Sequence, residues 1–240
     1  MREVAGGRPA SGHGGADADY RAAFRCFCHE DASVIVLSNG QADVGAIAEA
    51  LADAFLSPAP ATPAPIAPDP ATLADLAGYY VWGGGPGMTL QVTDGKLMAS
   101  TGGPPIEAKF LPDGDFYLLA PTYRFSRGPG GGLIESQGMG ASELVHRRAT
   151  RTHPSAADLA AIAGTYRSDE IDSTYDLAAT DRSLTLSCLR FAPLALSPAD
   201  KDAFDGPGLR LTIVRDGAGA PTGFRVSTFR VWGLWFQKIG

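Results

Sequence analysis

The chain has 240 residues, which is enough for one to three compact domains, and 45% of them are hydrophobic, so packed cores can form. Its 30 glycines and 18 prolines favour turns over long helices, and its net charge of −6 argues against a general binder of nucleic acid or anionic membranes. No apolar run approaches the ~20 residues that cross a bilayer. The first residues lack the apolar core of a signal peptide. We therefore expect a cytoplasmic protein with no nucleic-acid partner and no membrane partner.

Three strands and one helix are expected in the first quarter of the chain. The first strand ends near His13, the second spans residues 20–28, and the continuous apolar run at 33–38 indicates a strand covered on both faces. A helix follows over residues 44–56. Its apolar stripe consists of Val44, Ile47, Ala48, Leu51 and Phe55.

The cysteines are three in number, which argues against a disulfide framework. Cys26 and Cys28 alternate within the second strand, so packing is the expected role, with a metal or redox pair as the alternative. Two cysteines supply only two ligands. We expect no metal and no cofactor.

A proline-rich linker and an internal repeat follow the helix. Residues 58–70 hold six prolines, which is typical of a stiff, extended connection. Residues 73–80 and 159–166 are identical at five of eight positions. Short strands with hairpin turns follow each copy, which predicts two small closed antiparallel barrels. The expected divisions are residues 1–57, 58–70, 71–150 and 151–240.

A His-x-Gly motif lies on the first of these strands. Gly14 and Gly15 would let a substrate backbone lie close along the strand edge. The N–H of Ala16 could point at an oxyanion, and His13 could donate a hydrogen bond to a bound carbonyl or carboxylate. The alternative is a glycine-rich turn in which the histidine is incidental.

The surroundings of this motif carry a family resemblance. A His-x-Gly strand, two more strands, the run Ser38-Asn39-Gly40 and a closing helix resemble the end of the penicillin-recognising serine hydrolases, which include class C β-lactamase-like enzymes and D-aminopeptidases. Two β-barrels after that helix make the chain similar to D-aminopeptidases over essentially its whole length. The resemblance implies a mainly β chain: the remnant of an α/β β-lactamase-like catalytic domain, then two lipocalin-like barrels.

The family's nucleophile motif is absent from this sequence. Family members carry Ser-x-x-Lys and Tyr-x-Asn upstream of the His-x-Gly strand, and no serine here has a lysine three residues on. The resemblance therefore implies the C-terminal portion of a serine hydrolase that releases an N-terminal D-amino acid from a peptide or amide. His13, Gly15 and Ala16 would serve catalysis, and Gly14 would contact substrate. Without its missing N-terminal catalytic part, the chain is expected to be inactive.

A second candidate element is the polar segment 196–208, which is expected to be a long insertion between strands. In D-aminopeptidases a loop of the last barrel reaches the catalytic cleft, and the resemblance implies that role here. Asp202, Asp205 and Gly206 would then contact substrate, with a carboxylate meeting its free ammonium group. The alternative is a solvated surface loop.

Other functions stay open. The barrels could form a lipocalin-like binding or oligomerisation module, for example in a homodimer. The chain could also belong to another esterase or peptidase of the same superfamily with appended barrels. The aromatic residues Trp232, Trp235 and Phe236 are expected to pack in the barrel core and between domains. Arg147, Arg148 and Arg151 form a basic cluster that is expected to be a solvated strand end.

Overall fold

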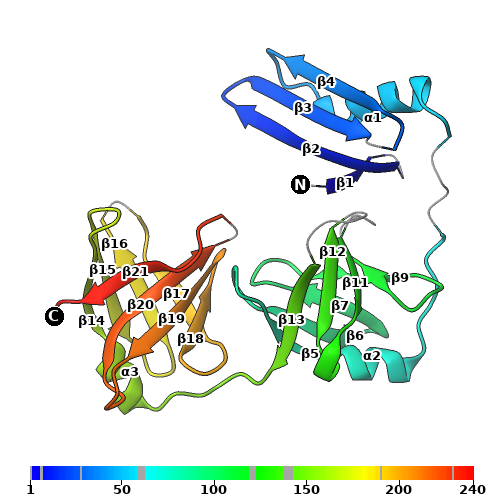
Figure 1. Cartoon of the computed structure of the whole chain (residues 1–240). Helices are drawn as coiled ribbons and strands as arrows, with labels where there is room; N and C mark the ends of the chain where they lie inside the picture. The colour runs from blue at the N-terminus through cyan, green and yellow to red at the C-terminus, as the bar shows by residue number, and fades with distance from the viewer. Residues whose placement is uncertain are drawn as a thin grey trace. The chain divides into compact units, whose positions relative to one another are not determined.

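The computed structural model contains three sheets (Figure 1). It describes residues 2–5, 8–27, 29–58, 63–118, 123–137, 143–189, 191–228 and 230–240. One sheet has four strands, one has nine, and eight strands close into a barrel, so the predicted mainly β class is confirmed. By their contacts, the residues form two compact units. The first comprises residues 1–68, 108–129 and 133–145, and the second comprises residues 69–107, 130–132 and 146–240. The predicted domain limits stay a prediction.

The four-stranded sheet is antiparallel and runs in chain order. Its strands are β1 (Arg2–Ala5), β2 (Arg8–Asp17), β3 (Tyr20–Phe27) and β4 (Ala32–Ser38). Three strands were expected, the first ending near His13. The structure adds β1 and extends β2 to Asp17, so His13 lies in mid-strand. The glycines at 12, 14 and 15 lower the strand propensity of this run, so the sequence predicted an earlier end. Seven consecutive residue pairs with β3 nevertheless keep the run in the sheet.

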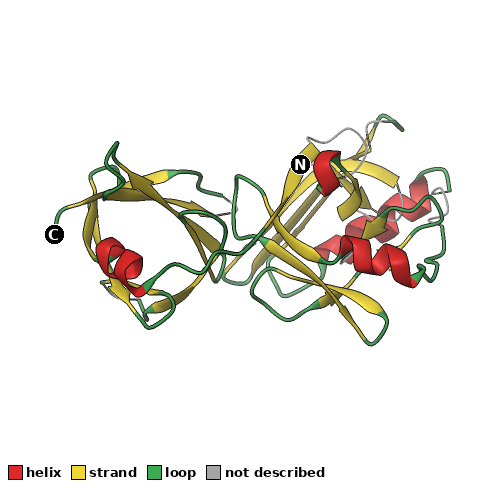
Figure 2. Cartoon of the chain, turned by 90° about the horizontal axis from the view of Figure 1, so that it is seen from below, coloured by secondary structure: helices red, strands yellow, loops and turns green. Residues whose placement is uncertain are grey.

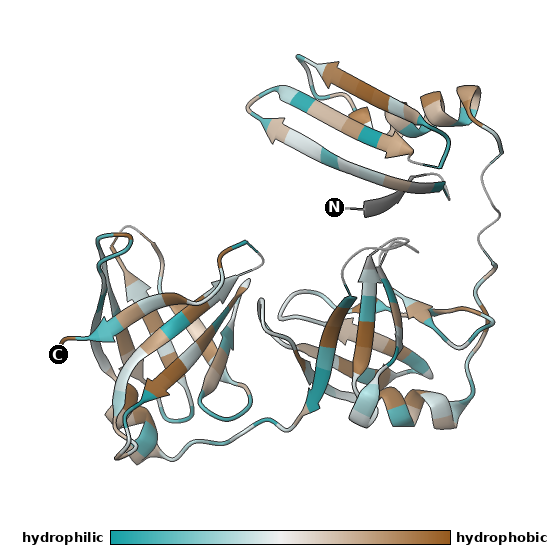
Figure 3. Ribbon diagram, viewed as in Figure 1, coloured by the Kyte–Doolittle hydropathy of each residue, from teal (hydrophilic) through white to brown (hydrophobic). Residues whose placement is uncertain are grey.

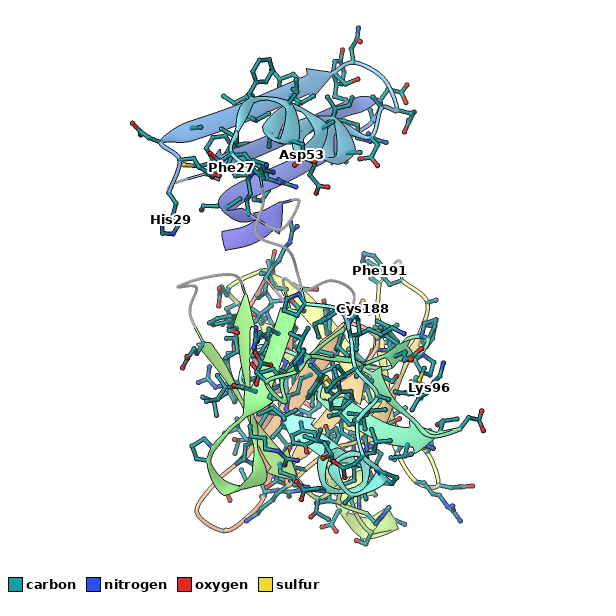
Figure 4. All side chains as sticks on the ribbon, turned by 90° about the vertical axis from the view of Figure 1, so that its right-hand side faces the viewer. Phe27, His29, Asp53, Lys96, Cys188 and Phe191 are labelled. Carbon is teal, nitrogen blue, oxygen red and sulfur yellow. The ribbon has the colours of Figure 1, made fainter. Side chains whose placement is uncertain are left out.

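One face of this sheet is covered by helix α1 (Val44–Phe55). The Asp43 side chain caps the helix by accepting from the Ala46 N–H at 3.0 Å. Figure 4 labels Phe27 and Asp53 where the sheet meets the helix. Only part of the expected apolar stripe is buried, because the rest of it does not face the sheet. The buried helix residues are Val44, Ala48 and Ala52, whereas Ile47, Leu51 and Phe55 are exposed.

The other face of the sheet is apolar and open. Ile35 and Leu37 on β4 are 65% and 77% exposed, and Phe24 on β3 is also exposed. His13 pairs with Phe24, which pairs with Ile35, so all three side chains share this face. The expectation that β4 is covered on both faces is therefore wrong for this chain. The apolar character of β4 is visible in Figure 3.

The nine-stranded sheet nearly closes on itself. Its strand order is β8-β7-β6-β5-β13-β12-β11-β10-β9, and β8 and β9 at its two ends are joined through Ala108 alone. Helix α2 (Pro70–Leu76) precedes it, and a short helical turn, η1 (Pro129–Gly131), lies within it. The strands are β5 (Gly78–Val81), β6 (Met88–Thr93), β7 (Lys96–Ser100), β8 (Ile106–Glu107), β9 (Lys109–Phe110), β10 (Phe116–Tyr117), β11 (Tyr123–Arg127), β12 (Leu133–Gln137) and β13 (Glu143–Ala149).

The last eight strands form a closed antiparallel barrel, which Figure 2 shows as a ring. They are β14 (Gly164–Ser168), β15 (Ser173–Ala179), β16 (Leu184–Cys188), β17 (Leu194–Pro198), β18 (Ala203–Gly206), β19 (Leu209–Arg215), β20 (Pro221–Thr228) and β21 (Leu234–Lys238). Side chains fill the interior, where the rings of Tyr166, Phe224 and Phe236 pack together. Phe236 was predicted to lie in this core, and that prediction is confirmed, whereas Trp232, which was part of the same prediction, is 67% exposed.

The sequence repeat corresponds to a repeated helix–strand corner. Helix α3 (Ala156–Ile162) precedes β14 as α2 precedes β5, and both helices bury two apolar residues. The Tyr80 hydroxyl donates to the Leu76 carbonyl at 2.9 Å, and the Tyr166 hydroxyl donates to the Ile162 carbonyl. The tyrosine shared by both copies thus satisfies a carbonyl at each helix end.

Candidate functional site

The His-x-Gly motif lies along a free strand edge. Residues 12–17 of β2 pair with β3 on one side, whereas β1 pairs only with residues 8–11 on the other. Among the described residues, nothing pairs with that second edge beyond Ser11. His13, Gly14, Gly15 and Ala16 are all exposed. The edge therefore leaves backbone groups open to another extended chain.

Local packing explains one glycine of this motif and not the others. A Cβ at Gly12 would lie 2.2 Å from the Phe24 carbonyl oxygen, so the fold requires a glycine there. At Gly14 and Gly15 the nearest contact of such a Cβ would be 3.7 Å, an ordinary distance. A side chain would therefore fit at both positions, so packing within the fold does not explain these two glycines.

The predicted insertion at 196–208 is wrong, because most of the segment belongs to the barrel wall. It holds the end of β17, the whole of β18 and two short turns. Leu196 and Phe204 are buried in the barrel core. Ala203 packs with Tyr79 and Val81 of β5 instead. The polar residues between these positions gave the segment a loop-like composition.

The three residues predicted to contact substrate in this segment belong to a different compact unit from His13. His13 belongs to the first unit, and Asp202, Asp205 and Gly206 belong to the second. Asp202 lies in the β17–β18 turn and pairs with Arg215 at 2.7 Å. Asp205 and Gly206 lie on β18 and line a small cleft.

Asp205 belongs to a buried polar cluster that we call the carboxylate cluster: Tyr79, Asp200, Asp205 and Arg210. The Asp205 carboxylate accepts from the Tyr79 hydroxyl, from the Gly87 N–H at 3.0 Å and from Arg210 at 3.1 Å. Arg210, which faces Asp205 across the β18–β19 pair, also binds Asp200. The cluster therefore joins β5 and the β5–β6 loop to the barrel wall, all within the second unit.

The three arginines of the basic cluster are exposed, as expected of a solvated strand end, and two of them also contact the carboxylate cluster. Arg147 binds Asp200 at 2.7 Å. Arg148 donates to backbone carbonyls at the end of α2, and Arg151 lies 4.0 Å from the centroid of the Tyr79 ring. Tyr79, Asp200 and Arg210 belong to the carboxylate cluster but were not predicted from the sequence. The only available signal was the number of arginines and aspartates, which says nothing about pairing.

Burial controls the protonation of this cluster. Desolvation raises the pKa of the Asp205 carboxyl, and the hydrogen bonds from Tyr79 and Gly87 oppose that rise. Desolvation, followed by the bond to Asp205, raises the pKa of Tyr79 to about 12. Burial raises the pKa of Tyr166 to about 12 as well.

These two tyrosines make the second unit sensitive to alkali. Between the usual tyrosine pKa of ~10 and the folded value of about 12, the unfolded chain loses protons that the folded chain keeps. The free energy of unfolding should therefore fall as the pH rises through this window, by roughly 2–3 kcal/mol per tyrosine. Urea denaturation across that range measures the loss, and Tyr79→Phe should make it smaller. An unchanged slope in Tyr79→Phe would contradict the assignment.

Within the described residues, no group of His, Cys, Asp and Glu side chains is arranged to hold a metal ion, and no helix is long and apolar enough to cross a membrane. Cys28, the partner expected for Cys26, lies outside the described residues. No known family model matches the chain, and no curated protein matches it either.

Proposed function

We propose that the chain is the C-terminal part of a D-aminopeptidase-like serine hydrolase of the penicillin-recognising family. The observation that carries the proposal is the free edge of β2 at the His-x-Gly motif. An extended substrate could add to this edge as a further strand. Gly14 and Gly15 keep the approach open, the Ala16 N–H would face the oxyanion, and His13 would donate to the substrate carbonyl or carboxylate.

The uncovered surfaces of the four-stranded sheet support a missing partner segment. Phe24, Ile35 and Leu37 form an apolar face next to His13, and Leu51 and Phe55 expose a second apolar stripe on α1. Contiguous apolar surface of this kind is unusual on a complete domain. A catalytic segment that supplies Ser-x-x-Lys would cover it and bring the nucleophile to the β2 edge.

Two alternatives receive less support. In a lipocalin-like module the ligand would occupy the barrel interior, but the described interior is filled by a continuous cluster of buried side chains. Another esterase or peptidase of the same superfamily would use the same β2 edge, so substrate assays have to separate it from a D-aminopeptidase. The proposed substrate is a small peptide or amino-acid amide with a free amino group.

The test is to express the chain together with the coding sequence that precedes it in its reading frame. A Ser-x-x-Lys segment should lie there, and the extended protein should hydrolyse D-alanine amide in preference to L-alanine amide. His13→Ala should lower kcat/KM about a hundredfold, as expected for the loss of one hydrogen-bond donor to the substrate. The matched control is His29→Ala, which changes an exposed histidine in the β3–β4 turn and should leave kcat/KM unchanged.

The chain by itself should show no turnover of either amide, because it offers one wall of an active site without a nucleophile. Saturable hydrolysis by the chain alone, abolished by one serine or cysteine substitution, would overturn the proposal. An extended protein without Ser-x-x-Lys, or one in which both histidine variants behave alike, would overturn it as well.

A further inference from the structure

A small cleft of about 230 Å³ lies in the second unit, outside the barrel interior. Its wall includes Gly87, Thr101, Arg151, Ser197, Asp205 and Gly206. It has room for roughly eight waters and is below the ~300 Å³ at which drug-sized ligand sites begin. Any specific ligand is therefore small.

On one wall, Asp205 has a hydrogen-bonding position to spare. Its carboxylate offers about four acceptor positions. Three are used, by the Tyr79 hydroxyl, the Gly87 N–H and Arg210. The side chain is 11% exposed, and the part that is accessible borders the cleft. The carboxylate is thus held rigidly and can still accept a bond from a cationic group.

Arg151 supplies the opposite charge at the same cleft. Its guanidinium stacks on the Tyr79 ring and donates to the Pro198 carbonyl at 3.0 Å and to the Thr89 hydroxyl at 3.3 Å. Guanidinium carries five N–H donors, so three have no partner among the described residues. No described carboxylate forms an ion pair with Arg151. The side chain is therefore preorganised to bind a carboxylate.

The charge balance around the cleft leaves Arg151 as the surplus group. Arg210 and Arg147 neutralise Asp205 and Asp200. Among the described residues no carboxylate lies within ion-pair distance of Arg151, although its charge acts on Asp205 at longer range. This cation and a carboxylate with one open position face a single small cleft. We infer that this cleft binds a free α-amino acid, whose carboxylate pairs with Arg151 and whose ammonium group donates to Asp205. This inference does not depend on the proposed hydrolase.

Binding can be measured on the chain itself by following backbone amide resonances during a titration with alanine. The N–H signals of Gly87, Gly102 and Gly206, which border the cleft, should shift in a saturable way. Alanine amide lacks the carboxylate and N-acetylalanine lacks the ammonium group, so each should bind at least about tenfold more weakly than alanine. This comparison separates a zwitterion site from a site for a simple anion or cation.

Two variants test the assignment of the charges. Arg151→Gln should weaken alanine binding about tenfold or more. Arg225→Gln is the matched control, because Arg225 also stacks on an aromatic ring, at 5.5 Å from the centroid of Trp235, but lies outside the cleft. Ser197→Leu should block binding without a change of charge. Circular dichroism and thermal melts establish that each variant is folded.

Three results would overturn the inference. They are the absence of saturable shifts at the cleft glycines, equal binding of alanine and either blocked analogue, and equal affinity in folded Arg151→Gln and Arg225→Gln. None of these assays involves turnover, so the hydrolase proposal is tested separately.

Discussion

Replacing Arg210 with methionine is expected to lower the free energy of unfolding of the second unit by about 3–5 kcal/mol. Among the described residues, Arg210 carries the only guanidinium that binds both Asp200 and Asp205. Both carboxylates are largely buried, so at least one charge would remain desolvated without its partner. Urea denaturation followed by circular dichroism measures the loss. The loss should shrink toward pH ~4, since a protonated Asp205 carries no charge.

Arg167→Met is the control for this experiment. Arg167 also binds two aspartates, Asp169 and Asp172, but these are 92% and 84% exposed. Solvent screens such pairs, so the expected change is below ~1 kcal/mol. Similar losses in the two variants would show that burial of the carboxylate cluster contributes nothing to stability.

Phe204→Ala is expected to cost about 3–5 kcal/mol, the usual range for removing a buried phenylalanine. Phe204 is 2% exposed and packs in the core of the closed barrel. This result would establish that residues 203–206 are a strand of the barrel wall, because a solvated loop would tolerate the same change. Thermal or urea denaturation measures the effect.

Phe191→Ala is the matched control. Phe191 lies in the β16–β17 connection of the same barrel and is 74% exposed (Figure 4). Its truncation should change the free energy of unfolding by no more than ~0.5 kcal/mol. Equal effects at the two phenylalanines would contradict the position of β18.

The sequence was sufficient where a local pattern decides the structure. Apolar continuity located β4, helical spacing and Asp43 located α1, and the repeated run at 73–80 and 159–166 located both helix–strand corners. In each case the deciding interactions join residues that are close in the chain. The tyrosine of each corner, for example, binds a carbonyl four residues earlier.

Interactions between distant residues could not be predicted. Asp205 binds Tyr79 across 126 positions of sequence and Gly87 across 118. From composition, Asp205 was only an acidic residue in a polar segment. Such a segment is equally typical of a surface loop and of a strand that packs against another part of the chain. The outer face of β4 shows the same limitation, because an apolar run does not reveal what covers it.

Strand β4 has a practical consequence for anyone who handles this protein. It lies at the end of the four-stranded sheet, and its outward side chains Ile35 and Leu37 are exposed. An apolar edge strand is a template for pairing between molecules, whereas a closed barrel offers no such edge. In concentrated solutions the protein should therefore aggregate by pairing of strands from the first 60 residues of different molecules, while the barrel remains folded. Ile35→Lys should reduce this aggregation, because it places a charge on the exposed face and leaves the helix-covered face unchanged.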